Sequence, residues 1–276
     1  NIPFQKYQGL GNDFVIFHEK DVERIEWGLL AKQVCSRNFG IGADGMIIAR
    51  QKPLEMMFFN QDGSKAPMCG NGLRCFAKFA VSEKLAEMEH FPVKTGGGEM
   101  KVKVSGLVEI NLGAPCFKTS EIPAIYHHEE LLDRIVRIDE RELRISAVFL
   151  GTSHCVVFSD PEDEIAEEDI GIIGPLLENY YIFPEKINVN FCTRISREKL
   201  RVRTWERGVG RTLACGTGAS ASFAIARRLG YVEEEVEAKL PGGTLILRDQ
   251  GGEIHMMGGA DLVARGEYIY RNEEKL

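Results

Sequence analysis

The sequence predicts an α+β or mixed α/β fold built from two similar halves, and three observations support this prediction. A Cys-Gly-polar-Gly motif that opens an Ala- and Phe-containing stretch occurs twice, at residues 69–72 and 215–218. Further pairs of similar blocks surround it in the same order, as expected for an internal repeat. Most other segments alternate apolar and polar residues with the period of two that is typical of strands.

The expected elements follow from this alternation and from helix-like apolar spacing in the remaining stretches. Helices are expected at residues 27–37, 70–86, 127–134, 170–181 and 216–229. Strands are expected at residues 13–18, 45–50, 54–59, 100–104, 107–112, 144–149, 154–158, 187–192, 200–206, 244–248 and 253–257. A last strand over about residues 261–271 is expected to return to the first half.

The two halves are expected to form separate lobes, because matched blocks run through both. Besides the cysteine motifs, these blocks are residues 11–16 with 151–156, 58–63 with 204–209, and 95–98 with 240–243. The chain crosses from one half to the other near Gly113. The predicted lobes are therefore residues 1–115 with 261–276, and residues 116–260.

Composition excludes several classes of function. The 276 residues are 44% hydrophobic and 27% charged, as in a soluble globular protein. A net charge of −7 and the absence of a basic tract argue against a nucleic-acid partner. No apolar run approaches the roughly 20 residues that cross a membrane, and no export signal is recognisable at the start. The seven scattered cysteines indicate reduced thiols, and hence a cytoplasmic protein.

The two motif cysteines, Cys69 and Cys215, are the strongest candidates for catalytic groups. The first N–H groups of a helix favour negative charge, and a cysteine there is shifted towards the reactive thiolate. Two such thiols on opposite sides of one carbon can remove a proton on one side and return it on the other. Either cysteine alone could equally be a small buried apolar residue. The flanking glycines, present in both motifs, favour the catalytic interpretation for the pair.

Polar residues near these motifs are candidate binding residues. Asn60 and Glu206 occupy equivalent places, and Arg207 can clasp a carboxylate with two hydrogen bonds. Asn188 is polar within an apolar strand, and His154 breaks the symmetry because Phe14 stands at the equivalent place. A surface ion pair, a strand cap and a core histidine are the respective structural alternatives.

A Gly-x-Gly-x-x-Gly pattern at residues 40–45 is not interpreted as a nucleotide site. Such a site needs a strand before the glycines and a helix after them, whereas here the expected order is reversed. No Walker motif, Schiff-base lysine or metal cluster is recognisable, since no cysteine pair has CxxC spacing and the six histidines are dispersed. We therefore expect chemistry without a cofactor or a metal.

Six motifs taken together closely resemble the diaminopimelate epimerase family, over residues 4 to about 266. They are residues 9–14, 39–45, 60–64, 68–72, 206–208 and 214–218. The resemblance implies two pseudosymmetric lobes, each a mostly antiparallel sheet wrapped around a central helix, and a homodimer. It implies epimerisation of LL-2,6-diaminopimelate, a small-molecule amino acid substrate, to the meso form, in lysine and peptidoglycan precursor synthesis. It also implies neither pyridoxal phosphate nor metal.

The resemblance also assigns roles to individual residues. Cys69 and Cys215 would be the acid and the base, with His154 and Glu206 assisting at the catalytic centre. The residues that would line the substrate are Asn12, Asn60, Gly70, Asn71, Thr152, Asn188, Glu206, Arg207, Gly216 and Thr217.

One segment departs from the family pattern. The family usually has Asn-Pro-His where this chain has Thr152-Ser153-His154, so a contact to the distal amino acid group of the substrate would lose its amide. A racemase of another amino acid, using the same two cysteines, is therefore the main alternative. A cysteine hydrolase would need one nucleophile with a histidine partner, and an amino-acid-binding protein would need neither thiol.

Overall fold

The computed structural model describes residues 1–87 and 89–271, which form two compact units. Unit 1 contains Asn1–Ile110 and the C-terminal segment from Gly258, and unit 2 contains Asn111–Met257. The lobe boundaries expected after residues 115 and 260 stay a prediction. Both units are mixed α/β structures with more strands than helices, as expected.

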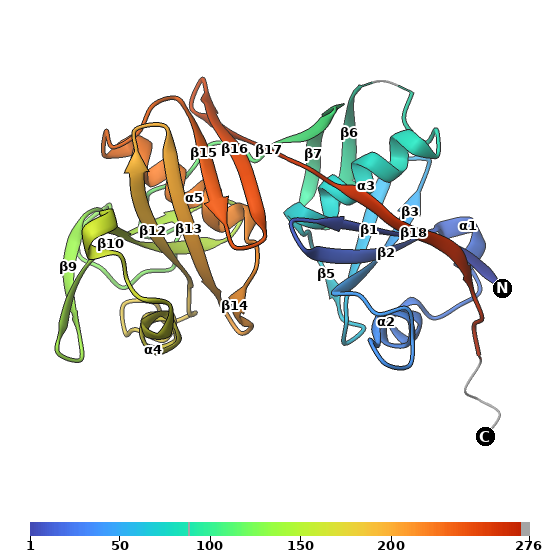
Figure 1. Ribbon diagram of the computed structural model, residues 1–276, viewed down its shortest axis with the longest axis horizontal. Helices are drawn as coiled ribbons and strands as arrows, with labels where there is room; N and C mark the ends of the chain where they lie inside the picture. The colour runs from blue at the N-terminus through green and yellow to red at the C-terminus, as the bar shows by residue number, and fades with distance from the viewer. Residues whose placement is uncertain (88, 272–276) are drawn as a thin grey trace. The chain divides into compact units, whose positions relative to one another are not determined.

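Unit 1 consists of a sheet and three helices (Figure 1). Its strands are β1 (Ile2–Gly9), β2 (Asn12–His18), β3 (Gly45–Arg50), β4 (Glu55–Asn60), β5 (Lys65–Ala66), β6 (His90–Thr95), β7 (Gly98–Ser105), β8 (Leu107–Asn111) and β18 (Asp261–Tyr268). Its helices are α1 (Glu19–Val22), α2 (Trp27–Cys35) and α3 (Gly70–Ser82).

Unit 2 repeats this plan. Its strands are β9 (Arg134–Ile138), β10 (Arg141–Phe149), β11 (Ser153–Ser159), β12 (Asn188–Ser196), β13 (Lys199–Glu206), β14 (Gly210–Thr212), β15 (Glu235–Leu240), β16 (Gly243–Gln250) and β17 (Glu253–Gly258). Its helices are α4 (Glu167–Glu178) and α5 (Gly216–Arg228), with a short 3₁₀ helix at Pro161–Asp163.

The strand pairings of the two units correspond one to one. The parallel pairs are β2–β3 and β4–β6 in unit 1, and β11–β12 and β13–β15 in unit 2. The remaining pairs are antiparallel, and β1–β18 in unit 1 corresponds to β10–β9 in unit 2. The last strand therefore returns to the first unit, as expected. Each unit is thus one copy of a duplicated fold.

A helix lies at the centre of each unit, and a second helix covers the outside of the sheet. Helix α3 contacts β1, β2, β3, β4 and β7, while α5 contacts strands β10 to β13, β15 and β16. Helix α2 packs its Leu30 and Val34 against the other face of β3 and β4. Strands such as β3 are consequently apolar on both faces, which is typical of strands covered on both sides.

The expectation of a helix at 127–134 is wrong. Those residues have helix-forming composition, but tertiary hydrogen bonds hold them in an irregular, non-helical segment. The backbone N–H of Thr119 donates to the carbonyl of Glu129 (2.8 Å), and that of Ala147 donates to the carbonyl of Leu131 (2.8 Å). Leu131 is fully buried. Packing has overridden local propensity here.

Several strands lacked a clear signal in the sequence. They are β1, β5, β6, β9, β14 and β15. Residues 40–44 form the loop between α2 and β3, so the order around the glycine-rich pattern is helix then strand, as expected.

Candidate active site

Cys69 is the N-cap residue of α3. Its backbone is extended (φ −137°, ψ 121°), and its Sγ accepts a hydrogen bond from the backbone N–H of Gly72 at 3.5 Å. The following helix of 13 residues directs its partial positive end at this sulfur. Cys69 is half-buried, so its thiol lies at the boundary between the core and solvent.

A chain of amides connects Cys69 to a buried cation. The oxygen of the Asn12 side chain accepts from the Cys69 thiol (3.8 Å) and from the Asn71 amide (3.3 Å). The Asn71 oxygen in turn accepts from Nη2 of Arg74 at 2.9 Å. Arg74 is fully inaccessible, and its Nε donates to the carbonyl of Gly259. Burial lowers the pKa of Arg74, but a guanidinium keeps its charge in proteins.

The other end of the Asn12 amide is fixed by a charged cluster. Its Nδ2 donates to Asp44 at 2.6 Å, and Arg37 bridges Asp44 and Asp13. Burial raises the pKa of Asp13, but hydrogen bonds from Lys6 and Arg37 outweigh it and hold that pKa below its ordinary value. A carboxylate only accepts, so the Asn12 amide nitrogen faces Asp44 and its oxygen faces the thiol.

Asn60 is at the end of β4, in a turn of its own. Its Nδ2 donates to Oγ of Ser64 at 2.9 Å, and its backbone N–H donates to the Ser64 carbonyl. The Asp62 carboxylate closes this turn by accepting from Ser64. The Asn60 side chain is half-buried, and its amide bonds to the turn that follows β4.

Cys215 repeats the geometry of Cys69 at the start of α5. Its backbone is extended (φ −116°, ψ 103°), and its Sγ accepts from the Gly218 N–H at 3.3 Å. The Thr217 hydroxyl lies 3.5 Å from the same sulfur. Both predicted thiols are therefore N-caps of equivalent central helices, with Gly70 and Gly216 as the first helical residues.

The surroundings of Cys215 contain a buried polar network. Asn190 of β12 donates through Nδ2 to Nδ1 of His154 (3.2 Å) and to the carbonyl of Cys155 (3.1 Å). Its oxygen accepts from the Thr204 hydroxyl at 2.9 Å. His154 is completely buried, and burial, aided by the charge of Arg207, lowers its pKa to about 3. The imidazole is therefore neutral near pH 7.

A second set of predicted residues meets at the edge of β11 and β12. Asn188 donates to the Thr152 hydroxyl (3.4 Å) and to the carbonyl of Ser153 (3.0 Å), and its oxygen accepts from the backbone N–H of Arg207 (3.0 Å). The exposed Arg207 guanidinium donates to the carbonyl of Glu185.

Glu206 ends β13 and is half-buried. Burial raises the pKa of its carboxyl group, against a hydrogen bond of 2.6 Å from the Thr212 hydroxyl. A carboxylate held partly out of water beside the second cysteine motif is suited to an ammonium group.

Four of the other five thiols are deeply buried. Burial raises the pKa of Cys35 to about 12, and raises those of Cys75, Cys155 and Cys192 as well. Buried thiols with raised pKa values are unreactive. The fifth, Cys116, is half-buried but lies in an isolated bridge to Phe149 and caps no helix, so the two helix caps are the best candidates for reactive thiols.

The structure brings most predicted residues together within their own unit. In unit 1 these are Asn12, Cys69, Gly70 and Asn71, while Asn60 bonds to its own turn. In unit 2 they are grouped around Cys215 and around Asn188. Sequence reasoning missed Asn190, Thr204 and Arg74. Asn190 had a usable signal, since it follows Asn188 by two positions and so lies on the same strand face.

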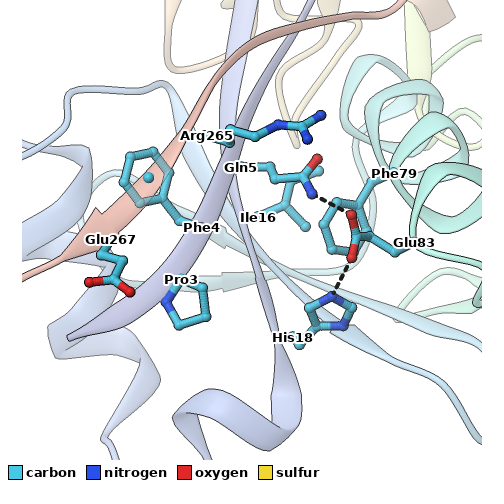
Figure 2. A pocket seen from close by; sticks show the side chains of 10 residues that line it. Pro3, Phe4, Gln5, Ile16, His18, Phe79, Glu83, Arg265 and Glu267 are labelled. Atoms are coloured by element: carbon cyan, nitrogen blue, oxygen red, sulfur yellow. Dashed lines mark hydrogen bonds and ion pairs between the residues drawn. The ribbon is translucent and has the colours of Figure 1, made fainter.

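A pocket of about 350 Å³ lies elsewhere in unit 1, between β1, β18 and the end of α3. Figure 2 shows Glu83 in it, accepting from Gln5 at 2.5 Å and lying 3.4 Å from Nε2 of His18. Phe4, Ile16 and Phe79 supply apolar walls. None of the predicted site residues lines this pocket, so the chemistry of the thiols belongs elsewhere.

Residues 1–87 and 89–271 contain neither a metal-binding cluster nor a membrane-spanning helix. No group of three or more His, Cys, Asp or Glu side chains is arranged to hold a metal ion there. None of the helices in that part of the chain has the length and apolarity needed to span a membrane.

Comparison of the sequence with protein families gives a match that covers most of the chain. The family described as diaminopimelate epimerase matches residues 4–117 and 146–263. A diaminopimelate epimerase of Carboxydothermus hydrogenoformans is 39% identical over 96% of this chain and 99% of its own length. That of Alkaliphilus metalliredigens is 38% identical over 97% of this chain and 98% of its own.

Solved structures with lower identity share the fold. A probable proline racemase from Agrobacterium radiobacter superposes with a TM-score of 0.69 at 12% identity, covering 100% of this chain and 94% of that one. A hydroxyproline epimerase from Agrobacterium vitis gives 0.66 at 13% identity, covering 96% and 91%. The duplicated two-unit architecture is therefore shared with proteins of very different sequence.

Proposed function

The chain belongs to the diaminopimelate epimerase family, and we propose that it interconverts LL- and meso-2,6-diaminopimelate without a cofactor, in lysine and peptidoglycan precursor synthesis. It is accordingly an isomerase. The observation that carries the proposal is the pair of thiols at equivalent helix N-termini, one in each unit. A binding protein would need neither thiol, and a hydrolase would need only one.

The reaction needs one proton removed and one returned. The thiolate of one cysteine takes the Cα proton, and the electron pair of the broken C–H bond passes into the adjacent carboxylate. The thiol of the other cysteine then delivers its proton to the opposite face of the carbon. Each turnover therefore exchanges the roles of the two sulfurs, and the reverse reaction starts from the resulting state.

The intermediate carries extra negative charge on the carboxylate, so stabilising that charge is the main task of the site. The N-terminal N–H groups of α3 and α5, which begin at Gly70 and Gly216, are the donors that we assign to it. Asn12, Asn71 and Thr217 flank the two sulfurs and would hold the substrate in register.

The ends of the substrate are assigned by charge. Glu206 would accept from an ammonium group and Arg207 would clasp a carboxylate. Asn60 and Asn188 would add amide contacts, and Thr152 would face the distal amino acid group. The neutral His154 would assist as a hydrogen-bond donor.

The test is deuterium uptake at Cα of diaminopimelate in heavy water, with wild type, Cys69→Ser and Cys215→Ser. We expect each substitution to lower the rate of epimerisation by at least about a hundredfold, as for loss of a general acid or base. Cys35→Ser provides the matched control, because Cys35 is buried and distant in sequence from both motifs. Full epimerisation by both single mutants would rule out the two-thiol mechanism.

Racemisation of another amino acid is the second candidate, and Thr152 is the observation that favours it. Its hydroxyl accepts a hydrogen bond from Asn188, in a place where the family usually has an amide. A panel of amino acids, compared by kcat/KM, separates the two. Turnover of another amino acid with diaminopimelate left unchanged would replace the first proposal by the second.

We also propose that the protein is a cytoplasmic homodimer. Five of the seven cysteines, namely Cys35, Cys75, Cys116, Cys155 and Cys192, form no disulfide, which suits a reducing compartment. Strand β18 pairs with β1 and carries exposed Leu262 and Val263 along an edge of unit 1, where a second chain could add contacts. Sedimentation equilibrium tests the dimer, and a purely monomeric species at micromolar concentration would contradict it.

A further inference from the structure

Three equivalent positions beneath the central helices differ completely between the units. Position by position, β2–β4 of unit 1 carry Phe14, Ile47 and Phe58, where β11–β13 of unit 2 carry His154, Asn190 and Thr204. The register establishes this correspondence, because Ile47 pairs with Phe58 and Asn190 pairs with Thr204. In unit 1, Phe14 and Phe58 form an edge-to-face aromatic pair at 5.9 Å. The three side chains beneath the central helix are therefore apolar in unit 1 and hydrogen-bonded to one another in unit 2.

The orientation of the Asn190 amide is fixed by its partners. The carbonyl of Cys155 can only accept, so the atom facing it is Nδ2, and the Thr204 hydroxyl donates to the remaining oxygen. The same Nδ2 therefore also donates to Nδ1 of His154. A ring nitrogen that accepts carries no proton, so the neutral imidazole carries its proton on Nε2.

Nε2 of His154 has no hydrogen-bond partner among the residues that the structure describes. A buried N–H without a partner is unfavourable, and native proteins keep such groups rarely. Arg207, a carboxylate-binding residue by type, donates its backbone N–H to Asn188, which is the strand partner of His154. A donor and a cation near each other are suited to a carboxylate.

We propose that Asn190, held by Thr204, is a positioning residue that fixes His154 in the Nε2–H form, and that this N–H donates to the reacting carboxylate once substrate binding uncovers the nitrogen, which is inaccessible in this structure. This inference rests on the proposed function for the identity of the ligand. The neutral donor would gain strength as negative charge builds up on that carboxylate after the Cα proton leaves.

Asn190 also lies against the first turn of the helix that carries the thiol. A Cβ atom placed on Gly218 would be 2.2 Å from the Asn190 oxygen, which no real structure tolerates. The Gly218 N–H is the donor to Cys215. One amide therefore supports both the imidazole and the backbone that caps the sulfur.

The direct test is the protonation pattern of His154, read by long-range ¹H–¹⁵N correlation on protein labelled with ¹⁵N-histidine. The signal that is missing in His154→Gln identifies the residue. We expect the Nε2–H form in the wild type, and loss of its dominance in Asn190→Leu, which keeps the size of the side chain but removes the donor. Thr204→Val is the milder second variant should Asn190→Leu fail to fold.

Kinetics on the same variants tests whether the tautomer matters. We expect kcat to fall about tenfold or more in Asn190→Leu with KM changed little, because the donor acts mainly in the transition state. His154→Gln, which keeps an N–H at the same end, should retain more activity than His154→Leu. Thr193→Val is the control: Thr193 is a fully buried threonine of the same strand that bonds to Ser159 instead.

An Nδ1–H form in the wild type overturns the inference. The inference is also overturned if the folded Asn190→Leu or Thr204→Val variant keeps the wild-type tautomer. It is overturned as well if the tautomer changes but kcat is no lower than in Thr193→Val. The spectra are recorded without substrate, so failure of the proposed function, seen as no turnover of diaminopimelate by the wild type, is distinguished from failure of the tautomer assignment.

Discussion

The two units hold their thiols with the same backbone and support them with opposite chemistry. Helix α3 rests on Phe14 and Ile47. The helix itself carries the fully buried Arg74. Helix α5 rests on the amide of Asn190 and carries the small Ser220 where α3 carries Arg74. The buried charge of unit 1 therefore lies on the helix, and the amide beneath α5 lies on the sheet.

This difference indicates which parts of a duplicated fold are constrained by its chemistry. The cap geometry is preserved in both copies, down to a glycine N–H that donates to sulfur. The layer beneath is not preserved, although it is buried in both.

The two units are expected to differ most in stability when the glycine that donates to each sulfur is replaced by alanine. Gly218→Ala would force a methyl group into the Asn190 amide, and we expect the free energy of unfolding to fall by about 3 kcal/mol. The methyl group of Gly72→Ala would meet its nearest neighbour among the described residues, Ile47, at 3.4 Å, so the loss of stability should stay within about 1 kcal/mol. Urea denaturation of both variants measures this, and equal losses would contradict the asymmetry.

The buried polar groups of the two helices provide the next contrast. Arg74→Met removes a charged donor from Asn71 and from the carbonyl of Gly259, so we expect a loss of about 2 kcal/mol. The Ser220 hydroxyl has no hydrogen-bond partner within the described residues, so Ser220→Ala should change stability by less than about 0.5 kcal/mol. A large loss for Ser220→Ala would show that its hydroxyl is used.

Unit 2 is also expected to lose stability at low pH through His154, a residue that unit 1 replaces with Phe14. The pKa of His154 is about 3 in the folded chain and 6.5 ordinarily, so below pH 6.5 the unfolded state binds the extra proton. Stability conferred by the neutral ring should therefore fall by about 1.4 kcal/mol per pH unit as pH drops from 6.5 towards 3. His154→Gln should lack this component in thermal unfolding measured across that range. Parallel curves for the two proteins would exclude it.

The smallest expected effect concerns the departure at Thr152. Thr152→Asn restores the amide usual in the family, and we expect KM for diaminopimelate to fall by a few-fold, equivalent to about 1 kcal/mol of binding. Ser159→Ala, at the other end of β11, controls for general effects on the strand. An increase of KM would indicate that the hydroxyl is matched to a different substrate.

Much of this architecture could be predicted from the sequence because the signals are local. Both thiol caps, both central helices and the return of the last strand follow from motif and period. The helix expected at 127–134 failed because the carbonyl of Glu129 is bonded by Thr119 and that of Leu131 by Ala147 of β10, which no local pattern records. Asn190 and Thr204 were missed because their partnership depends on strand register, and Arg74 because an arginine in a helix ordinarily faces water.

The pairing of β18 with β1 joins the first and last strands of unit 1, whereas unit 2 is one uninterrupted stretch of chain. Unit 2 therefore needs no segment beyond Met257, whereas the sheet of unit 1 lacks β18 until all of unit 2 has been translated. We expect the half that is translated second to complete its sheet no later than the half that is translated first.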